Sequence, residues 1–198
     1  AKRPSVFDLA TVPSSAVRRT SFANLVYQVA FTGMENTIVF LTFALFLYSP
    51  RDNAWLFLFN GACMIFAQGL ARQLVKRLGQ RKVIMIGMLT AAVAFSVVAL
   101  IPATRAVAGD GAETTFYLGL GLISFATGLI LPSVSALVSL YSGASEQGRN
   151  LGILRSAGSL ARVIGPVTAA LLYFHFGSHF WVYLGGALLM LPAIWIIY

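Results

Sequence analysis

Six long apolar stretches divide this sequence, and short polar connectors separate them. The stretches cover residues 21–49, 54–71, 83–103, 116–141, 150–176 and 180–198. A helix rises about 1.5 Å per residue, so each stretch is about long enough to cross a hydrocarbon core of about 30 Å. Barrel strands would be about ten residues long and would alternate polar with apolar residues, which these stretches do not do. The pattern predicts an all-α membrane protein in which six transmembrane helices form one bundle.

The composition supports this prediction. Only 10% of the residues are charged, against about 25% in a typical soluble domain. We expect residues 21–198 to form the bundle and residues 1–20 to be a cytoplasmic segment. The N-terminal residues lack the apolar core of a signal peptide, and the first residue is Ala1 rather than Met. We therefore expect the sequence to be a piece of a longer chain.

Basic residues fall mainly on one side of the predicted membrane. Ten Lys and Arg residues lie in the N-terminal tail and in the second and fourth connectors, which share one side if the helices alternate in direction. Only Arg51 and Arg105 lie on the other side. Cytoplasmic connectors carry the excess of Lys and Arg in membrane proteins, so both termini are expected in the cytoplasm. The net charge of +8 has this explanation and does not indicate nucleic-acid binding.

Glu35 is the only charged residue between Arg19 and Arg51. A charge at the centre of a membrane helix costs at least about 2.5–3.5 kcal/mol, so it normally faces a cavity or a partner and indicates a functional site. Residues spaced three or four apart lie on one face of a helix. The face that contains Glu35 also carries Gln28, Thr32, Val39 and Thr42, and Asn36 flanks it. We expect Gln28, Thr32 and Asn36 to line a substrate cavity with Glu35.

The fifth apolar stretch carries Arg155, Ser159 and Arg162 at the same spacing. Arg162 lies about 18 Å along the helix from its start, at a depth comparable with that of Glu35. Glu35 could bind a proton, because leaving water favours the neutral acid, and Arg162 could bind an anionic substrate. The alternative for both is a structural ion pair or a hydrogen-bonded polar cluster. Arg155 could instead extend its guanidinium to the cytoplasmic surface.

Two further patterns concern helix continuity and metal binding. Pro132 and Gly165–Pro166 are expected to bend their helices, either as plain kinks or as discontinuities at a binding site. His175 and His179 have the spacing of a ligand pair on one helix turn. Membrane di-iron centres need more ligands than two His, and Gly177 suggests that the helix ends between them. We expect no metal and no other cofactor.

Two passages resemble the major facilitator superfamily. Residues 131–173 are similar to its helices ten and eleven, and most closely to those of drug:proton antiporters related to tetracycline efflux proteins. The similar positions are Gln147, Gly148, Gly152, Ser156, Gly165 and Pro166. Residues 21–42 resemble helix seven of the tetracycline-transporter-like branch found in animals. The preceding tail, with Phe7, Ala16 and Val17, is similar to the end of the central cytoplasmic loop in that branch.

The second connector resembles a glycine and basic signature of this family. The similar residues are Gly69, Gly79, Arg81 and Lys82, which the resemblance places in a gating loop. The usual aspartate of that signature is absent, and no acidic residue lies between Asp52 and Asp110.

The resemblance implies a C-terminal half of a fold in which two six-helix bundles surround a central cavity. Such proteins are secondary active transporters that work by alternating access. Proton-coupled antiport of amphipathic organic anions or drugs is implied, with Glu35 coupling to protons and Arg162 contacting substrate. The expected partners are the lipid bilayer, a small-molecule substrate, protons, and either an N-terminal half or a second copy.

Two other functions are compatible with the residues alone. The helices could form a membrane scaffold that transports nothing, or a membrane-embedded metal enzyme. The second alternative lacks a convincing nucleophile–base pair or metal-binding cluster, so we do not expect an enzyme.

Overall fold

The computed structural model describes residues 8, 12, 14–102 and 111–198. In this part of the chain, six helices are long and apolar enough to cross a membrane. They are α1 (Ser15–Phe46), α2 (Pro50–Leu78), α3 (Gln80–Ala99), α5 (Gly111–Leu140), α6 (Gln147–Phe176) and α7 (His179–Ile197). The predicted all-α bundle of six membrane helices is confirmed. Most of the segment 1–20, including Lys2, Arg3 and Phe7, lies outside the described residues, as does Arg105.

The helices differ from the apolar stretches mainly at their ends. The first helix begins at Ser15 instead of residue 21, and α2 begins at Pro50, inside the expected connector. Pro50 is in the first turn of α2, where its missing N–H costs no helical hydrogen bond. The backbone N–H of Ser49 donates to the Asp52 carboxylate at 2.9 Å, as part of a capping box. These local polar contacts start the helix before the apolar residues do.

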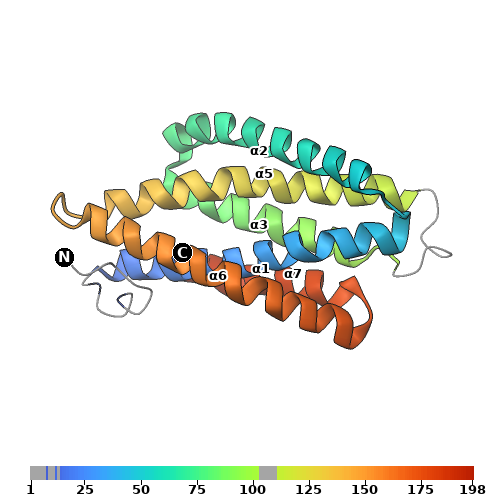
Figure 1. Cartoon of the computed structure of the whole chain (residues 1–198). Helices are drawn as coiled ribbons and strands as arrows, with labels where there is room; N and C mark the ends of the chain where they lie inside the picture. The colour runs from blue at the N-terminus through green and yellow to red at the C-terminus, as the bar shows by residue number, and fades with distance from the viewer. Residues whose placement is uncertain (1–7, 9–11, 13, 103–110) are drawn as a thin grey trace.

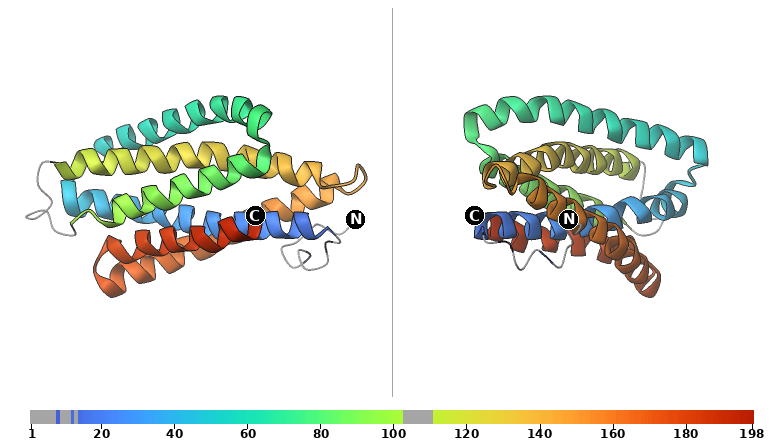
Figure 2. Two further views of the ribbon diagram at one scale, coloured as in Figure 1. Left: turned by 180° about the vertical axis from the view of Figure 1, so that it is seen from behind. Right: turned by 60° about the vertical axis from the view of Figure 1, so that its left-hand side comes forward.

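The six helices pack as one bundle with α2 and α6 at its edges (Figure 1). The α2 helix packs mainly on α5, and α6 packs mainly on α1. The α3 helix lies between α5 and α7, and α7 also contacts α1. Seen from behind, α3 and α7 are in front (Figure 2), whereas α6 is in front in Figure 1. The α2 and α6 helices are the least buried of the six.

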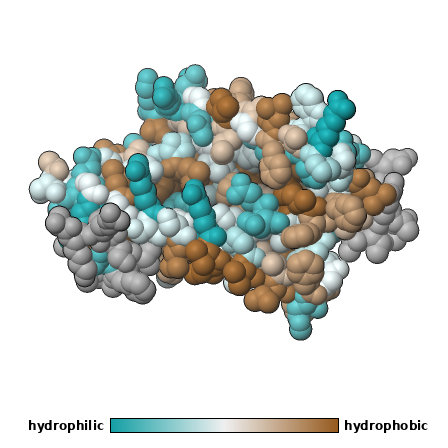
Figure 3. Space-filling model, viewed as in Figure 1, coloured by the Kyte–Doolittle hydropathy of each residue, from teal (hydrophilic) through white to brown (hydrophobic). Residues whose placement is uncertain are grey.

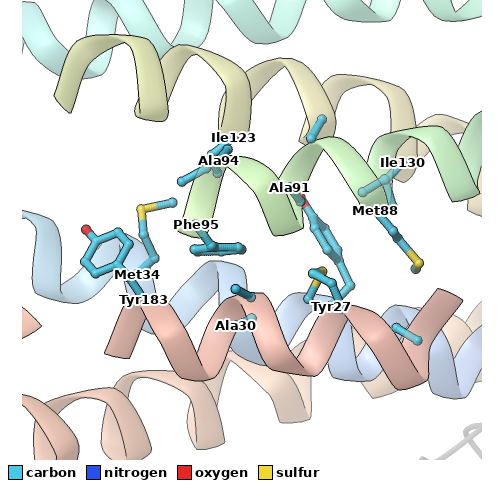
Figure 4. Close-up of a cluster of buried hydrophobic side chains, with 14 of the residues drawn as sticks. Tyr27, Ala30, Met34, Met88, Ala91, Ala94, Phe95, Ile123, Ile130 and Tyr183 are labelled. Carbon is cyan, nitrogen blue, oxygen red and sulfur yellow. The ribbon is translucent and has the colours of Figure 1, made fainter. Parts of the chain in front are cut away.

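The core lies between α1, α3, α5 and α7 (Figure 4). Its largest buried side chains include Tyr27, Met88, Phe95 and Tyr183. Small residues allow the helices to approach one another: a Cβ atom added at Gly87 of α3 would lie 2.6 Å from the Ile130 side chain of α5. Such close approach is how membrane helices associate, because lipid gives them little hydrophobic reason to do so.

The end of α1 is held to the start of α5 by a tyrosine. The hydroxyl of Tyr48 donates to the carboxylate of Glu113. Burial, and then the hydrogen bond to Glu113, raise the pKa of Tyr48 above its ordinary value. The hydroxyl therefore stays protonated and remains a donor at neutral pH.

Candidate functional site

Glycines bring α1 and α6 into close contact. A Cβ atom added at Gly158 would lie 2.8 Å from Nε2 of Gln28, and one added at Gly165 would lie 2.6 Å from the carbonyl oxygen of Val29. At Gly165 the obstacle includes backbone, so no side chain fits there, whereas at Gly158 the end of the Gln28 side chain would have to move. Gly165 therefore limits how closely the two helices approach. This contact sets the spacing between the polar groups that the two helices carry.

The threonines of the α1 polar face are buried in helix contacts. The Thr32 hydroxyl lies 2.8 Å from the carbonyl of Gln28 and 3.1 Å from that of Ala161 on α6, so it donates to one or shares its hydrogen between both. The Thr42 hydroxyl donates to Oδ1 of Asn53 on α2 at 2.8 Å. Both threonines are buried, so they connect helices and do not line an open surface.

Glu35 and Asn36 lie on the exposed side of α1. The Asn36 amide donates to the carbonyl of Thr32 at 3.1 Å. In the described part of the chain, no ion pair joins Glu35 directly to Arg162. The positive charge of Arg162 nevertheless acts on the Glu35 carboxylate. The two opposite charges therefore interact without direct contact.

A cavity of about 450 Å³ lies between α1, α5 and α6. Its polar lining consists of Asn24, Gln28, Ser135, Arg155, Ser159 and Arg162. Four predicted site residues, Gln28 on α1 and the three polar residues of α6, therefore share one cavity. Figure 3 shows hydrophilic side chains among hydrophobic ones across the middle of the molecular face on which α6 lies. We call this space the arginine cavity.

The predicted site residues Thr32, Glu35 and Asn36 do not line the arginine cavity. Asn24 and Ser135, which do line it, were not predicted from the sequence. Asn24 lies one helical turn before Gln28 on the same face, so extending the stripe by one step would have found it. Its side chain is buried, and its carbonyl oxygen has no hydrogen-bond partner among the described residues. Nothing in the sequence indicates which face of α5 meets α6, so Ser135 carried no such signal.

The residues of the expected gating loop are divided between two other cavities. Gly69 lines a cavity of about 420 Å³ between α2 and α5, together with Pro132. Gly79, Arg81 and Lys82 line a cavity of about 440 Å³ at the ends of α2, α3, α5 and α7. Gly79 has φ +81° and separates α2 from α3. Only glycine adopts this conformation easily, which explains its place at the junction.

The two prolines lie inside helices that continue past them. The α5 helix includes Pro132, and α6 includes Pro166. Proline has no N–H, so the Arg162 carbonyl, four residues before Pro166, loses its usual helical donor. Gly165, beside it, is where α6 meets α1 most closely. Gly165 thus provides a contact between α6 and α1, and Pro166 leaves the backbone carbonyl of Arg162 without its helical donor.

The two histidines lie on different helices. The α6 helix ends at Phe176, Gly177 has φ +61°, and α7 begins at His179. His179 is buried, with Nε2 3.0 Å from the carbonyl of Ile101 after α3, whereas His175 is exposed. No group of three or more His, Cys, Asp and Glu that could hold a metal occurs in the described ranges. His179 links the start of α7 to the end of α3.

The sequence model of the Major Facilitator Superfamily matches residues 23–198. Because this match covers most of the sequence, the chain belongs to the major facilitator superfamily. It is 32% identical over 178 residues to major facilitator superfamily domain-containing protein 10 of Mus musculus, covering 90% of this chain and 37% of that protein. The Homo sapiens protein of the same name is 30% identical over 178 residues, which again cover 90% of this chain and 37% of that protein. The chain thus spans less than half the length of these relatives.

Two solved structures have a similar fold. The human organic anion transporter MFSD10 (TETRAN) matches with a TM-score of 0.84 and 27% identity, over 98% of this chain and 45% of that chain. An auto-inhibited POT family peptide transporter matches with a TM-score of 0.72 over 93% of this chain and 36% of its own. Its 20% identity shows similarity of fold alone. The six helices fit one half of a major facilitator fold.

Proposed function

We propose that this chain is the C-terminal half of a secondary active transporter of the tetracycline-transporter-like branch, which moves amphipathic organic anions by alternating access. The arginine cavity is the observation that carries this proposal. It holds two guanidinium groups, Arg155 and Arg162, and no carboxylate among its lining residues. The human transporter of similar structure is described as an organic anion transporter, which supports the same substrate class here.

The chemistry of the arginine cavity suits an anion with an apolar body. A guanidinium presents a planar fork of donors that matches carboxylate, sulfonate or phosphate groups. Gln28 and Ser159 add neutral hydrogen-bonding groups, while Leu131, Val134 and Leu154 provide apolar walls. An amphipathic organic anion would satisfy both parts of this lining.

The open side of α1 and α6 requires a covering partner. Glu35, Arg155 and Arg162 are all exposed on the isolated bundle. At the central depth expected for Glu35 and Arg162, each charge would cost at least about 2.5–3.5 kcal/mol in lipid. Relatives of this chain are more than twice as long as the matched region. We propose that a second six-helix half covers this side, so that the arginine cavity opens onto a central pathway. A second copy of this chain is the alternative partner.

Glu35 is the proposed proton-coupling group. While Glu35 is ionised, its charge attracts Arg162 and competes with an anion for that guanidinium. When Glu35 takes up a proton, the competition ends and Arg162 binds an anion more strongly. Proton and anion therefore favour each other's binding, a linkage that is reciprocal by thermodynamic necessity. Antiport, which the family resemblance implies, requires the opposite sign.

A binding titration across pH tests this proposal. The probe is naphthalenesulfonate, whose charge does not change between weakly acidic and neutral pH, and the sample is the purified protein that contains this chain. Wild-type affinity should increase as the pH falls, whereas Glu35→Gln should bind as tightly at neutral pH as the wild type does in acid. Glu113→Gln, at the far end of α5, is the matched control and should keep the wild-type pH dependence. A Glu35→Gln protein with an unchanged pH dependence would refute the coupling role, and weaker wild-type binding in acid would instead indicate antiport.

A further inference from the structure

The 440 Å³ cavity at the ends of α2, α3, α5 and α7 is separate from the arginine cavity. Leu78 contributes from the last turn of α2, Leu137 from α5 and Ile197 from α7. No residue of α1 or α6 lines it. Two of the helices that line it, α3 and α7, are in front when the molecule is seen from behind (Figure 2). A ligand in this cavity would not touch the proposed substrate pathway.

The lining of this cavity divides into an apolar part and a cationic part. Leu78, Met85 and Leu137 form an apolar wall, whereas Arg81 and Lys82 bring two positive charges to the same space. Both cations are exposed, so they can reach a ligand without displacing core packing. A molecule that fits both parts has an anionic group attached to hydrocarbon.

Among the described residues, no Asp or Glu side chain lines this cavity beside its two positive charges. No acidic residue occurs between Asp52 and Asp110, and Arg81 and Lys82 form no ion pair in the described ranges. The first turn of α3 adds to the effect, because no side chain caps its N–H groups. Unpaired backbone N–H groups at a helix start favour an anion. The two cations and the start of α3 thus both favour an anionic ligand in this cavity.

The surroundings of the cavity are those of a bilayer surface. Exposed apolar side chains continue along α3 and α7, among them Leu89, Val93, Leu188 and Leu191. The excess of Lys and Arg at this end of the bundle predicts that it faces the cytoplasm. Cytoplasmic leaflets carry anionic phospholipids, and basic pockets between membrane helices on this side bind their head groups.

We infer that this cavity binds an anionic phospholipid, with its phosphate held by Arg81 and Lys82 and its acyl chains against the apolar wall. The segment from Arg72 to Lys82, both included, carries five cations, and all could attract anionic lipid in a diffuse way. Only Arg81 and Lys82 line the cavity, whereas Lys76 and Arg77 lie in the last turn of α2 outside it. This difference provides a matched pair of variants with the same change of charge.

Lipid retention measured by native mass spectrometry tests the inference without any transport assay, so its outcome does not depend on the proposed function. The purified protein is reconstituted in phosphatidylcholine nanodiscs with or without phosphatidylinositol 4-phosphate, and lipids retained after transfer to detergent are counted. Arg81→Gln with Lys82→Gln should weaken retention of the anionic lipid about a hundredfold or more, since each of the two lost charge-assisted bonds accounts for about a tenfold change in affinity or more. Lys76→Gln with Arg77→Gln should retain it nearly as the wild type does. The pair Arg81→Lys with Lys82→Arg, which keeps both charges, should also retain it.

Three results would overturn the inference. Equal losses in the two neutralised pairs would show diffuse attraction by the whole basic segment. Unchanged retention in the Arg81 and Lys82 pair would show that the cavity binds no anionic lipid. Displacement of the lipid by inorganic phosphate at an equal concentration would show a site for the free anion, in which the apolar wall contributes nothing. Circular dichroism of each variant confirms that the helices are intact.

Discussion

Arg155 and Arg162 are two turns apart on one face of α6, and both line the arginine cavity. Two like charges in one partly apolar space repel each other, and no carboxylate among the lining residues offsets this repulsion. The negative charge of the proposed substrate would relieve this repulsion. Glu35 lies outside the lining, and in the proposed mechanism it acts on Arg162 through its charge alone. Affinity and its control by protons would thus reside in different residues.

Tyr27 illustrates how a single buried hydrogen bond joins two helices. Its hydroxyl lies 2.6 Å from the Thr127 hydroxyl, and Thr127 donates its own hydrogen to the carbonyl of Ile123. Tyr27 on α1 is therefore the donor to Thr127 on α5. Tyr27→Phe should lower the free energy of unfolding by about 1 kcal/mol, because it removes the donor and little of the ring packing.

An SDS unfolding titration measures this loss. Tyr173→Phe serves as the control, since the described residues show ring contacts of Tyr173 with Phe40 and Phe174 but no hydrogen bond of its hydroxyl. Equal stability of the two variants would mean that the Tyr27–Thr127 bond contributes nothing measurable.

At the level of single residues, charge was the informative signal in the sequence. Glu35 and Arg162 could be selected because ionised groups are rare inside membrane helices. Asn24 could have been found by extending the α1 stripe one step before Gln28. Ser135 could not, since neutral polar residues are common in membrane helices and most join helices, as Thr32 and Thr42 do. Which neutral groups face a cavity depends on helix pairing, and a single sequence does not contain that information.

Among the helices, α1 and α6 form the contact on which the candidate site depends. Gly165→Ala should destabilise the protein by about 1–3 kcal/mol, the usual cost of adding a group to a packed interface, because its Cβ would meet Thr32 and Val29. Gly148→Ala is the control on the same helix. Nothing lies within 4 Å of a Cβ there, and alanine is favoured over glycine in a helix by about 0.5–1 kcal/mol.

Thermal unfolding followed by tryptophan fluorescence distinguishes the two alanine variants. Gly148→Ala should melt at or above the wild-type temperature, and Gly165→Ala clearly below it. A Gly165→Ala protein that melts with the wild type would show that the helices separate without cost, contrary to the close contact described.

Hydropathy predicted which segments form helices, but it did not predict the helix ends, which depend on local polar contacts. The apolar stretches predicted six helices, and all six are present in the described ranges. The predicted stretch from residue 54 to 71 is shorter than α2, which runs from Pro50 to Leu78. Capping by Ser49 and Asp52 sets its start, and Gly79 sets its end. Apolar runs record which residues suit lipid, whereas caps and backbone conformation set where a helix begins and ends.

On the scale of the whole molecule, the polar side of α1 and α6 should face water in the intact protein. In a Cys63→Ala background, Ser159→Cys should react rapidly with a charged thiol reagent added to membranes, and naphthalenesulfonate should slow the reaction. Leu188→Cys, on the exposed apolar surface of α7, should react slowly because it faces lipid. Similar rates at the two positions, with no protection by the anion, would argue against a water-filled arginine cavity.

The central claim is that the protein transports organic anions across the membrane and binds them in the arginine cavity. The most direct test is uptake of radiolabelled naphthalenesulfonate into liposomes that contain the protein, with a pH gradient imposed. Wild-type protein should show uptake that follows the gradient. Arg162→Gln should reduce it about tenfold or more, the consequence of losing one charge-assisted contact to the anion, and Arg51→Gln, outside the cavity, should leave it unchanged. Wild-type uptake that Arg162→Gln leaves intact would contradict the claim.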